Sequence, residues 1–528
     1  MLSEILKDER DFIIETIKDS PMPPKASGWK KAYSQKYLVE QVDLEGLQLT
    51  KEEEGRLIRY LGSFKYVEKT RRSFLSQEEI INHIYKDLAN VRQDIRRHMR
   101  YVSFSNFYNS GISDEKINIF KIGIKKLLSS LTWGPQIVKI TEVENTFGSV
   151  LKIDLRYLVD TQKRCWDMHT WDRITKHNPY YIHTPTKAHK VLSSIFQTDQ
   201  YIVRGDWLAF ALSQPPLYHD LQKLPKKLEH LEILLGINIR ENIIKTERAS
   251  GPRLVHRGGT TNSGVSDNHR IIERHNLPNW KGAFWISYDF LSPSDPKKDI
   301  RKHPFGPHGK DPFEHDGGEI IFNLPNGLQS YLLIDSKGNR IDVAPTEIVQ
   351  NKGGNDAIIT NGISCFECHT EGMRDMKFEM RNYASSFVNS SFTKADSLKF
   401  LHLYAPDKTR VRMEYDKIRY LEKLKFIHGR DITYDPISTL VNEFNKRVSF
   451  RSAAAELNLT ENGQRSLFEL FERLSSLNDF GSLQTQLNQN GLSRENFIHD
   501  FSLLRKHLHF LSPTFSIYDY DFEPLPQL

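Results

Sequence analysis

Two cysteines and a histidine form the segment of the sequence best suited to do chemistry. Cys365, Cys368 and His369 stand in the pattern Cys-x-x-Cys-His, which is typical of covalent haem attachment. Two thiols one helical turn apart can each reach one of the two vinyl groups at one edge of a porphyrin, and the adjacent imidazole can ligate the iron from the proximal side. The pattern therefore predicts haem c held by Cys365 and Cys368, with His369 as the proximal iron ligand.

Other readings of the same residues stay open. A zinc site would need ligands beyond Cys365 and Cys368, and histidines would have to supply them because the third cysteine, Cys165, lies far away in the sequence. A thioredoxin-like redox pair needs a strand before the motif and a helix after it, whereas Asn361-Gly362 indicates a loop. A chance match is the remaining reading. Zinc is thus the alternative cofactor, in a zinc-stapled interaction protein without haem.

The sixth iron position decides which haem chemistry is expected. A low-spin electron carrier needs a distal ligand, which is usually Met or His. The sequence offers Met413, His315, His303 and Met373 as candidates, although Met373 would share the proximal side with His369 if a helix continued through both. A filled position favours single-electron transfer to a redox partner protein. An open position favours a haem-dependent oxidoreductase, peroxidase-like or oxidant-sensing, that acts on a small oxidant.

Further charged residues are candidates for the surroundings of a haem. Arg270 and Arg274 are candidates to bind the anionic propionates, beside loop amides expected between Gly258 and Ser266. His315, Asp316 and Glu319 form a dense polar cluster next to an apolar run, and are candidates for an acid/base pair. The alternative for the cluster is a turn in which the carboxylates cap backbone amides.

The composition excludes several classes of protein. The 528 residues include 73 basic and 67 acidic side chains, a net charge of +6, which predicts no nucleic-acid binding. Hydrophobic residues make up 38%, enough for a sizeable core rather than a disordered chain. Three cysteines cannot form a disulfide scaffold.

No transmembrane span is expected. The longest uncharged apolar stretch, from Trp207 to Tyr218, is too short for a bilayer and contains Pro215 and Pro216. The N-terminus is a charged amphipathic segment that does not read as a secretory leader. Since haem c is attached after export, we expect a periplasmic or otherwise exported protein if haem is loaded, and a cytoplasmic one as the alternative.

The patterning predicts a helix-dominated α+β fold in four regions. They are a charged helical extension over 1–75, an α+β body over 76–345, the haem attachment segment over 346–395 and a helical region over 396–528. In the body we expect helices from Ser76 with a capping box, over Asp114–Leu128 and over Leu228–Arg248, and a loop over Gly258–Asn268.

Alternating apolar residues predict β-structure on both sides of these helices. A hairpin is expected across Asn145–Gly148. A three-stranded meander is expected over Glu319–Leu324, Leu328–Ile334 and Arg340–Val343, with an Asn326-Gly327 turn and burial on both faces. The meander leads through a loop to the Cys-x-x-Cys-His motif.

Several segments together resemble a poorly characterised bacterial family of proteins that carry a cytochrome c domain. The resemblance spans roughly residues 75–385 and implies haem c attachment at Cys365 and Cys368, iron ligation by His369 and a role in electron transfer; it supplies no substrate. The matching segments are Ile320–Gln329 (IIFNLPNGLQ), Tyr331–Ile334, Glu314–Glu319, Asn361–Met373 (NGISCFECHTEGM), Ser263–Ser266, Glu273–His275, Ser287–Phe290, Arg204 with Asp206-Trp207, and Pro215–Asp220.

Overall fold

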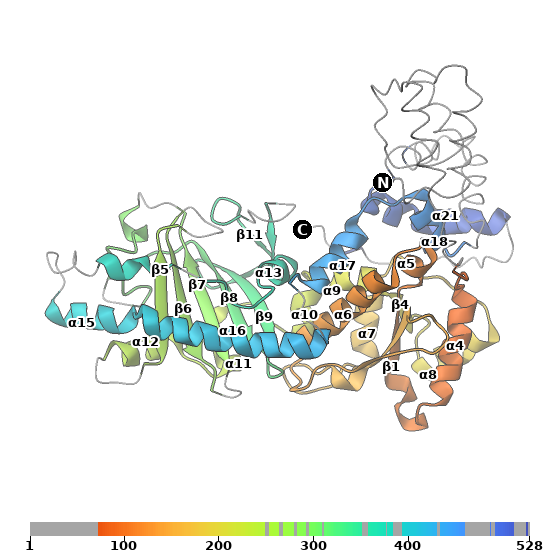
Figure 1. Ribbon diagram of the computed structural model, residues 1–528, viewed down its shortest axis with the longest axis horizontal. Helices are drawn as coiled ribbons and strands as arrows, with labels where there is room; N and C mark the ends of the chain where they lie inside the picture. The colour runs from red at the N-terminus through yellow and green to blue at the C-terminus, as the bar shows by residue number, and fades with distance from the viewer. Residues whose placement is uncertain are drawn as a thin grey trace, which may run out of the picture.

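The computed structural model shows an α+β protein in which helices dominate, as the sequence predicts (Figure 1). It describes residues 72–248, 253–262, 268–278, 282–291, 295–308, 311–350, 357–375, 377–383, 393–429, 433–459, 486, 491–511 and 524–525. The extension expected over 1–75 lies almost entirely outside the described residues. No helix in the described part of the chain is long and apolar enough to cross a membrane.

A four-stranded sheet lies among helices at the right of Figure 1. Its strand order is β2-β3-β1-β4, with β1 antiparallel to β3 and parallel to β4. The strands are β1 (Met99–Ser103), β2 (Ile140–Glu142), β3 (Val150–Asp154) and β4 (Ile202–Arg204). The helices and 3-10 turns of this part are α4 (Gln77–Ala89), η2 (Gln93–His98), α5 (Ser105–Asn109), α6 (Asp114–Ser130), η3 (Leu155–Tyr157), α7 (Met168–Thr175), α8 (Lys187–Phe196), α9 (Gly205–Leu212) and α10 (Leu217–Gln222).

A six-stranded antiparallel sheet forms the left of Figure 1, with strand order β10-β9-β8-β7-β6-β5. Each strand pairs with its neighbour in the chain, so the predicted meander is the last half of a longer one. The strands are β5 (Val255–Thr260), β6 (Arg270–Asn276), β7 (Ala283–Asp289), β8 (Gly317–Asn323), β9 (Gln329–Asp335) and β10 (Arg340–Ile341). Around them lie α11 (Leu228–Leu235), α12 (Ile239–Glu247), η4 (Pro296–Lys298), η5 (Glu379–Tyr383) and α15 (Lys394–Leu403).

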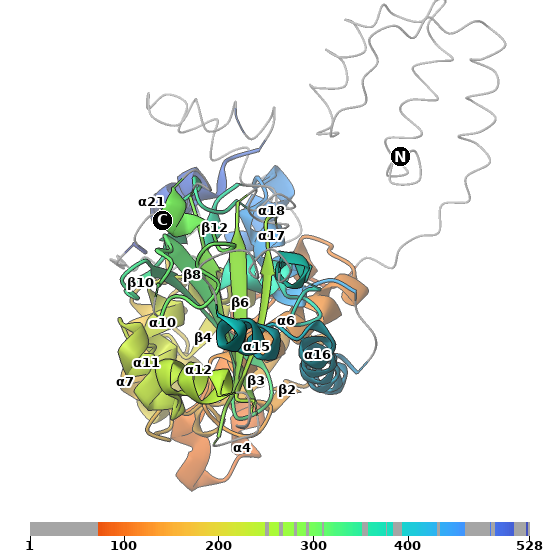
Figure 2. The same ribbon diagram turned by 90° about the vertical axis from the view of Figure 1, so that its left-hand side faces the viewer.

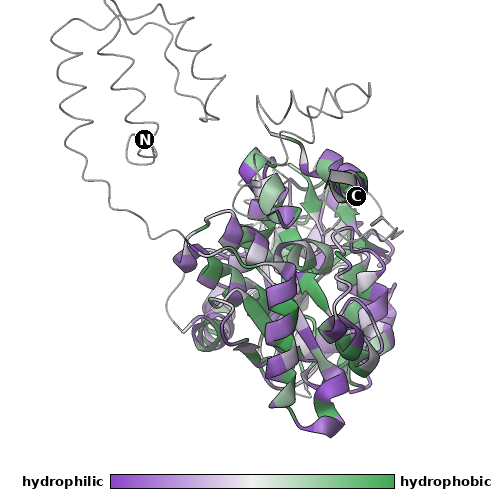
Figure 3. Ribbon diagram, turned by 90° about the vertical axis from the view of Figure 1, so that its right-hand side faces the viewer, coloured by the Kyte–Doolittle hydropathy of each residue, from purple (hydrophilic) through white to green (hydrophobic). Residues whose placement is uncertain are grey.

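The two parts meet at the motif helix α13 (Ile363–Cys368) and along α16 (Pro406–His428). A short ladder of β11 (Val343–Ala344) and β12 (Ile359–Thr360) precedes α13. The later helices α17 (Pro436–Asn445), α18 (Phe450–Glu456) and α21 (Arg494–Leu511) return to the first part, where α17 packs on α6 and α9. Hydrophobic residues line the interior and hydrophilic ones the outer helix faces (Figure 3).

Several predicted elements are confirmed and others are corrected. The Ser76 capping box, the helix from Asp114, the hairpin between β2 and β3 and the Asn326-Gly327 hairpin are present. The first helix was expected to run to His98 but ends at Ala89. The 3-10 turn η2 and strand β1 follow, and β1 pairs with β3 over residues 99–103 and with β4 over residues 101–103. The helix expected over 228–248 is split at Gly236, whose φ of 69° ends α11. Residues 258–260 of the expected loop are strand β5; 263–267 lie outside the described residues.

Candidate functional site

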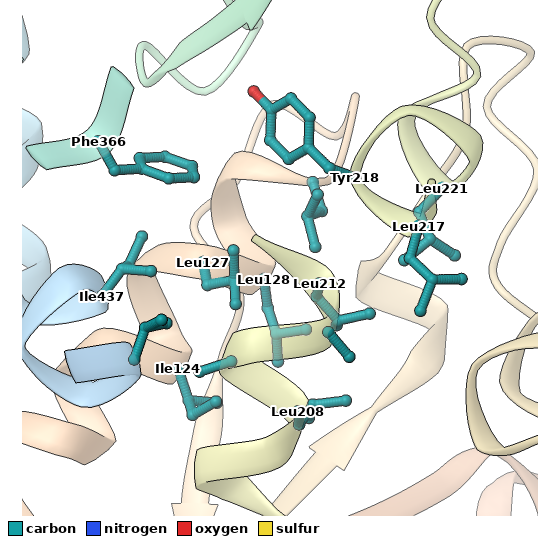
Figure 4. Close-up of a cluster of buried hydrophobic side chains, with 14 of the residues drawn as sticks. Ile124, Leu127, Leu128, Leu208, Leu212, Leu217, Tyr218, Leu221, Phe366 and Ile437 are labelled. Atoms are coloured by element: carbon teal, nitrogen blue, oxygen red, sulfur yellow. The ribbon is translucent and has the colours of Figure 1, made fainter. Parts of the chain in front are cut away.

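The motif helix α13 is fixed in place by the residues that lead into it and by Phe366. Gly362 has a φ of 89°, and a Cβ there would overlap the carbonyl oxygen of Ser213. The Asn361 amide meets the ring of His219. Phe366 points into the hydrophobic core between α6, α10 and α17 (Figure 4), and its ring packs at right angles against Tyr331 at 5.2 Å between centroids. The motif is therefore held by the core, although it is only six residues long.

A cavity of about 410 Å³ lies between α13 and one face of the six-stranded sheet. This cavity face carries Arg270 of β6, Asp289 of β7 and Glu319 of β8, while Cys365, Cys368 and His369 line the opposite wall. Apolar side chains make up much of the rest of the lining, among them Ile272, Ile321, Leu333, Ile341, Ile348, Val349, Ile359 and Met373. The other polar lining residues include Thr260, Asn262, Ser287, Ser364, Arg374, Asp375 and Lys377. The size and the mixture of apolar walls with a few convergent polar groups are those of a small-molecule site.

The hydrogen bonds of His369 define how its imidazole is presented. Nδ1 lies 3.0 Å from the carbonyl oxygen of Gly372, which can only accept, so Nδ1 carries the proton and donates it. Nε2 is the ring nitrogen that faces Glu319, and it lies 3.4 Å from Oε1 of that carboxylate. The ring of Tyr331 stacks on the imidazole at 5.9 Å between centroids with 28° between the planes. A backbone acceptor at Nδ1 is the arrangement that orients a metal-ligating histidine through Nε2.

Two charged side chains in the cavity, Glu319 and Arg270, have partners of opposite charge. Burial alone would raise the pKa of Glu319, but His369 and Arg270 outweigh it and hold that pKa at about 2. Arg270 makes a two-pronged ion pair with Asp289, with Nε 2.5 Å and the second nitrogen 3.1 Å from the carboxylate oxygens. Burial, followed by the neighbouring Glu319 carboxylate, raises the pKa of both cysteine thiols. The thiols are therefore protonated at neutral pH.

Of the sixth-ligand candidates from the sequence, only Met373 is among the described residues that line this cavity. Met413 is buried in α16 within the main hydrophobic core. His303 contacts Asp311, with Nδ1 3.0 Å from the carboxylate. His315 packs against the rings of Tyr288 and Phe313. Sequence spacing could not show which of these four candidates borders the cavity, because it does not reveal on which side of the sheet the segments that carry them fold.

The structure separates the other predicted polar residues. Glu319 faces His369, whereas Asp316 pairs with Lys298 at 2.6 Å and His315 lies among aromatic rings, so the three do not form the expected acid/base cluster. Arg270, the other predicted propionate-binding residue, lies in the cavity wall, where its guanidinium is paired with Asp289.

The expectation for Arg274 is corrected by its contacts. Its guanidinium is buried against Asp416 of α16, with nitrogen–oxygen distances of 2.7 and 2.9 Å. Both arginines project from the same face of β6, four residues apart, but α16 covers only the end at Arg274. Arg274 is therefore committed to a structural ion pair.

Tyr331, Phe366 and Gly372 are site residues that the sequence analysis did not single out. Tyr331 projects from β9 onto His369, and its alternation with Leu333 on the cavity face is the only sequence signal for it. Gly372 has a φ of 92°, which lets the chain turn back and present its carbonyl to His369. A glycine three residues after the histidine is the signal for that turn.

We predict that Gly362→Ala destabilises the protein by about 2–4 kcal/mol, because the new Cβ meets the Ser213 backbone and the φ is strained. Urea unfolding followed by circular dichroism measures the loss. Gly429→Ala is the matched control, since Gly429 also has a positive φ, 67°, but has no atom within 4 Å of the new Cβ. The control should cost about 1 kcal/mol. Equal losses in the two variants would contradict the close approach to Ser213.

Among the described residues, no group of three or more His, Cys, Asp or Glu side chains is arranged to hold a metal ion. In comparisons with protein-family models, curated proteins and solved structures, none matches the chain.

Proposed function

We propose that the protein is a mono-haem c-type redox protein that passes single electrons through a haem attached at Cys365 and Cys368. The observation that carries the proposal is that the three motif side chains, Cys365, Cys368 and His369, border the same cavity. Nδ1 of the His369 ring donates to the Gly372 carbonyl, which leaves Nε2 facing Glu319.

The residues of the cavity fit the group. The apolar walls suit a porphyrin, and the cationic side chains of Arg374 and Lys377, with Asp375 between them in the sequence, are in the lining and suit its propionates. Arg270 would have to share its guanidinium between a propionate and Asp289. When bound, the haem would supply a one-electron Fe(III)/Fe(II) couple.

The chain's own residues would hold and shield that couple. His369 would supply the proximal imidazole, oriented by Gly372 and stacked on Tyr331. Glu319, whose carboxylate lies 3.4 Å from Nε2, would have to give up this contact to an iron ion and keep its longer one, 3.9 Å, with Arg270. Met373 is the cavity residue whose thioether is the candidate for the distal position.

The test is a haem stain on a denaturing gel with a pyridine haemochrome spectrum. The full chain is produced with and without an added export leader in a host that matures cytochromes c. Covalent haem in the exported protein supports the proposal. A protein that carries no haem in either form, and binds zinc instead, contradicts it. The oxidised spectrum then separates a six-coordinate carrier from an open, peroxidase-like iron.

We predict that His369→Ala removes the imidazole-ligated spectrum while covalent haem remains detectable on the gel, because the thioethers do not depend on the ring. Free imidazole added to the variant should restore the spectrum, since the deleted side chain leaves a space of its own size beside Tyr331. Titration of the oxidised protein with imidazole measures the effect. An unchanged spectrum in the variant would show that another residue ligates the iron.

A further inference from the structure

Helix α16 carries apolar side chains on two opposite faces. One face is buried in the body through Met413, Tyr420, Leu424 and Ile427. The other is exposed, and its members are Val411 (67% exposed), Tyr415 (50%), Ile418 (47%) and Phe426 (68%). We call these four residues the outer stripe.

The outer stripe is a single row that points away from the protein. At 100° per residue its four members fall within an arc of about 80°, centred opposite the buried face. Figure 2 shows α16 nearly end-on at the edge of the body. An aligned row of exposed apolar side chains, unlike scattered apolar residues, marks an interaction surface.

The side chains beside the outer stripe are mostly basic. Six basic residues stand against three exposed acidic ones, a net charge of +3 along the accessible side of the helix, while Lys417 is held by Glu371 at 2.9 Å. The Lys125 ammonium of α6 adds to the six, 5.5 Å from the Phe426 ring. The basic residues are Lys408, Arg410, Arg412, Arg419, Lys423 and Lys425, and the acidic ones are Asp407, Glu414 and Glu422.

We propose that the outer stripe of α16 binds an anionic lipid surface. The row is straight over about 22 Å on a convex helix, a shape that meets a flat surface along its whole length. Apolar side chains in the middle would enter the headgroup region, and the flanking lysines and arginines would meet anionic headgroups, as in interfacial amphipathic helices. The inference does not depend on haem at Cys365.

The test is flotation of the full-length protein with vesicles of equimolar phosphatidylglycerol and phosphatidylcholine, or of phosphatidylcholine alone. We expect binding to the anionic vesicles only, weakened at high salt. The double variant Val411→Glu, Phe426→Glu should lower partitioning by about tenfold or more. Ile233→Glu is the matched control with unchanged binding, because Ile233 is 77% exposed on α11, at the other side of the body (Figure 2).

A second variant tests the surface by a gain that misfolding cannot produce. Glu422 lies in the middle of the arc and opposes an anionic surface, so Glu422→Gln should raise partitioning by about fivefold. No binding of the wild type to anionic vesicles at low salt would overturn the proposal and leave an acidic protein as the occupant. Equal binding to both vesicle types, unchanged binding by the double variant, or no gain in Glu422→Gln would also overturn it. Covalent haem is scored separately on a gel, so the two proposals can fail independently.

Discussion

Replacing Cys365 and Cys368 together by serine is expected to abolish covalent haem while the protein remains folded. Both sulfur atoms border the cavity, and no other described cysteine lies near it, because Cys165 is exposed in the four-stranded part of the molecule. Serine is close to cysteine in size but does not form thioethers with a porphyrin. We therefore expect the haem stain of the double variant to fall to background in the exported protein.

The control separates loss of attachment from loss of fold. Cys165→Ser changes the same atom at an exposed site and should keep all of the haem stain. Cys365 is buried, so a hydroxyl there should cost about 1–3 kcal/mol, and the far-ultraviolet circular dichroism of the double variant should stay that of the wild type. Covalent haem retained by the folded double variant would refute attachment at this motif.

The single variants sharpen the same experiment. Cys365 is buried and Cys368 is half-buried, so the two sulfur atoms meet the cavity from different depths. Each single serine variant should hold haem through one thioether, and its pyridine haemochrome band should lie between those of a protein with two thioethers and of free haem. A wild-type band in either variant would show that the substituted cysteine is not attached.

Local patterns in the sequence predicted individual helices and helix caps better than they predicted which strands pair with one another. The Ser76 cap and the apolar face of Asp114–Leu128 depend on residues within two helical turns, and both predictions are confirmed. The helical pattern from Ser76 was expected to run to His98, but the helix ends at Ala89, and the strand at 99–103 was not predicted. Its partners, β3 and β4, lie about 50 and 100 residues further on, so no local signal identifies the strand.

In the candidate site, too, the contiguous motif could be predicted, whereas the contacts between distant residues could not. The motif itself is contiguous and could be read directly, and Glu319 was singled out from its neighbours on β8. Its true contact, His369, is 50 residues away and depends on how α13 folds over the sheet. Met373 could not be chosen over His303 and His315 for the same reason, because only the fold decides which loops border the cavity.

Asp416→Ala is expected to destabilise the protein by about 3–5 kcal/mol, even without haem, because it leaves the buried Arg274 guanidinium without its carboxylate. The same carboxylate accepts a hydrogen bond from the indole of Trp285 at 3.2 Å. Urea unfolding of the haem-free chain measures the loss. Asp407→Ala, at the exposed start of the same helix, is the control and should cost at most about 1 kcal/mol.

A double variant tests whether the cost comes from the stranded charge. Arg274→Met in the Asp416→Ala background removes the unpaired guanidinium, so the double variant should be more stable than the sum of the single losses by at least about 1 kcal/mol. This result also bears on the site. If Arg274 served a haem propionate instead, Asp416→Ala would leave the haem-free protein close to wild-type stability, and the two substitutions would be additive. A large coupling energy between the two substitutions in the haem-free chain would therefore show that Arg274 holds α16 on the sheet. Arg270 would then be the β6 arginine that lines the cavity.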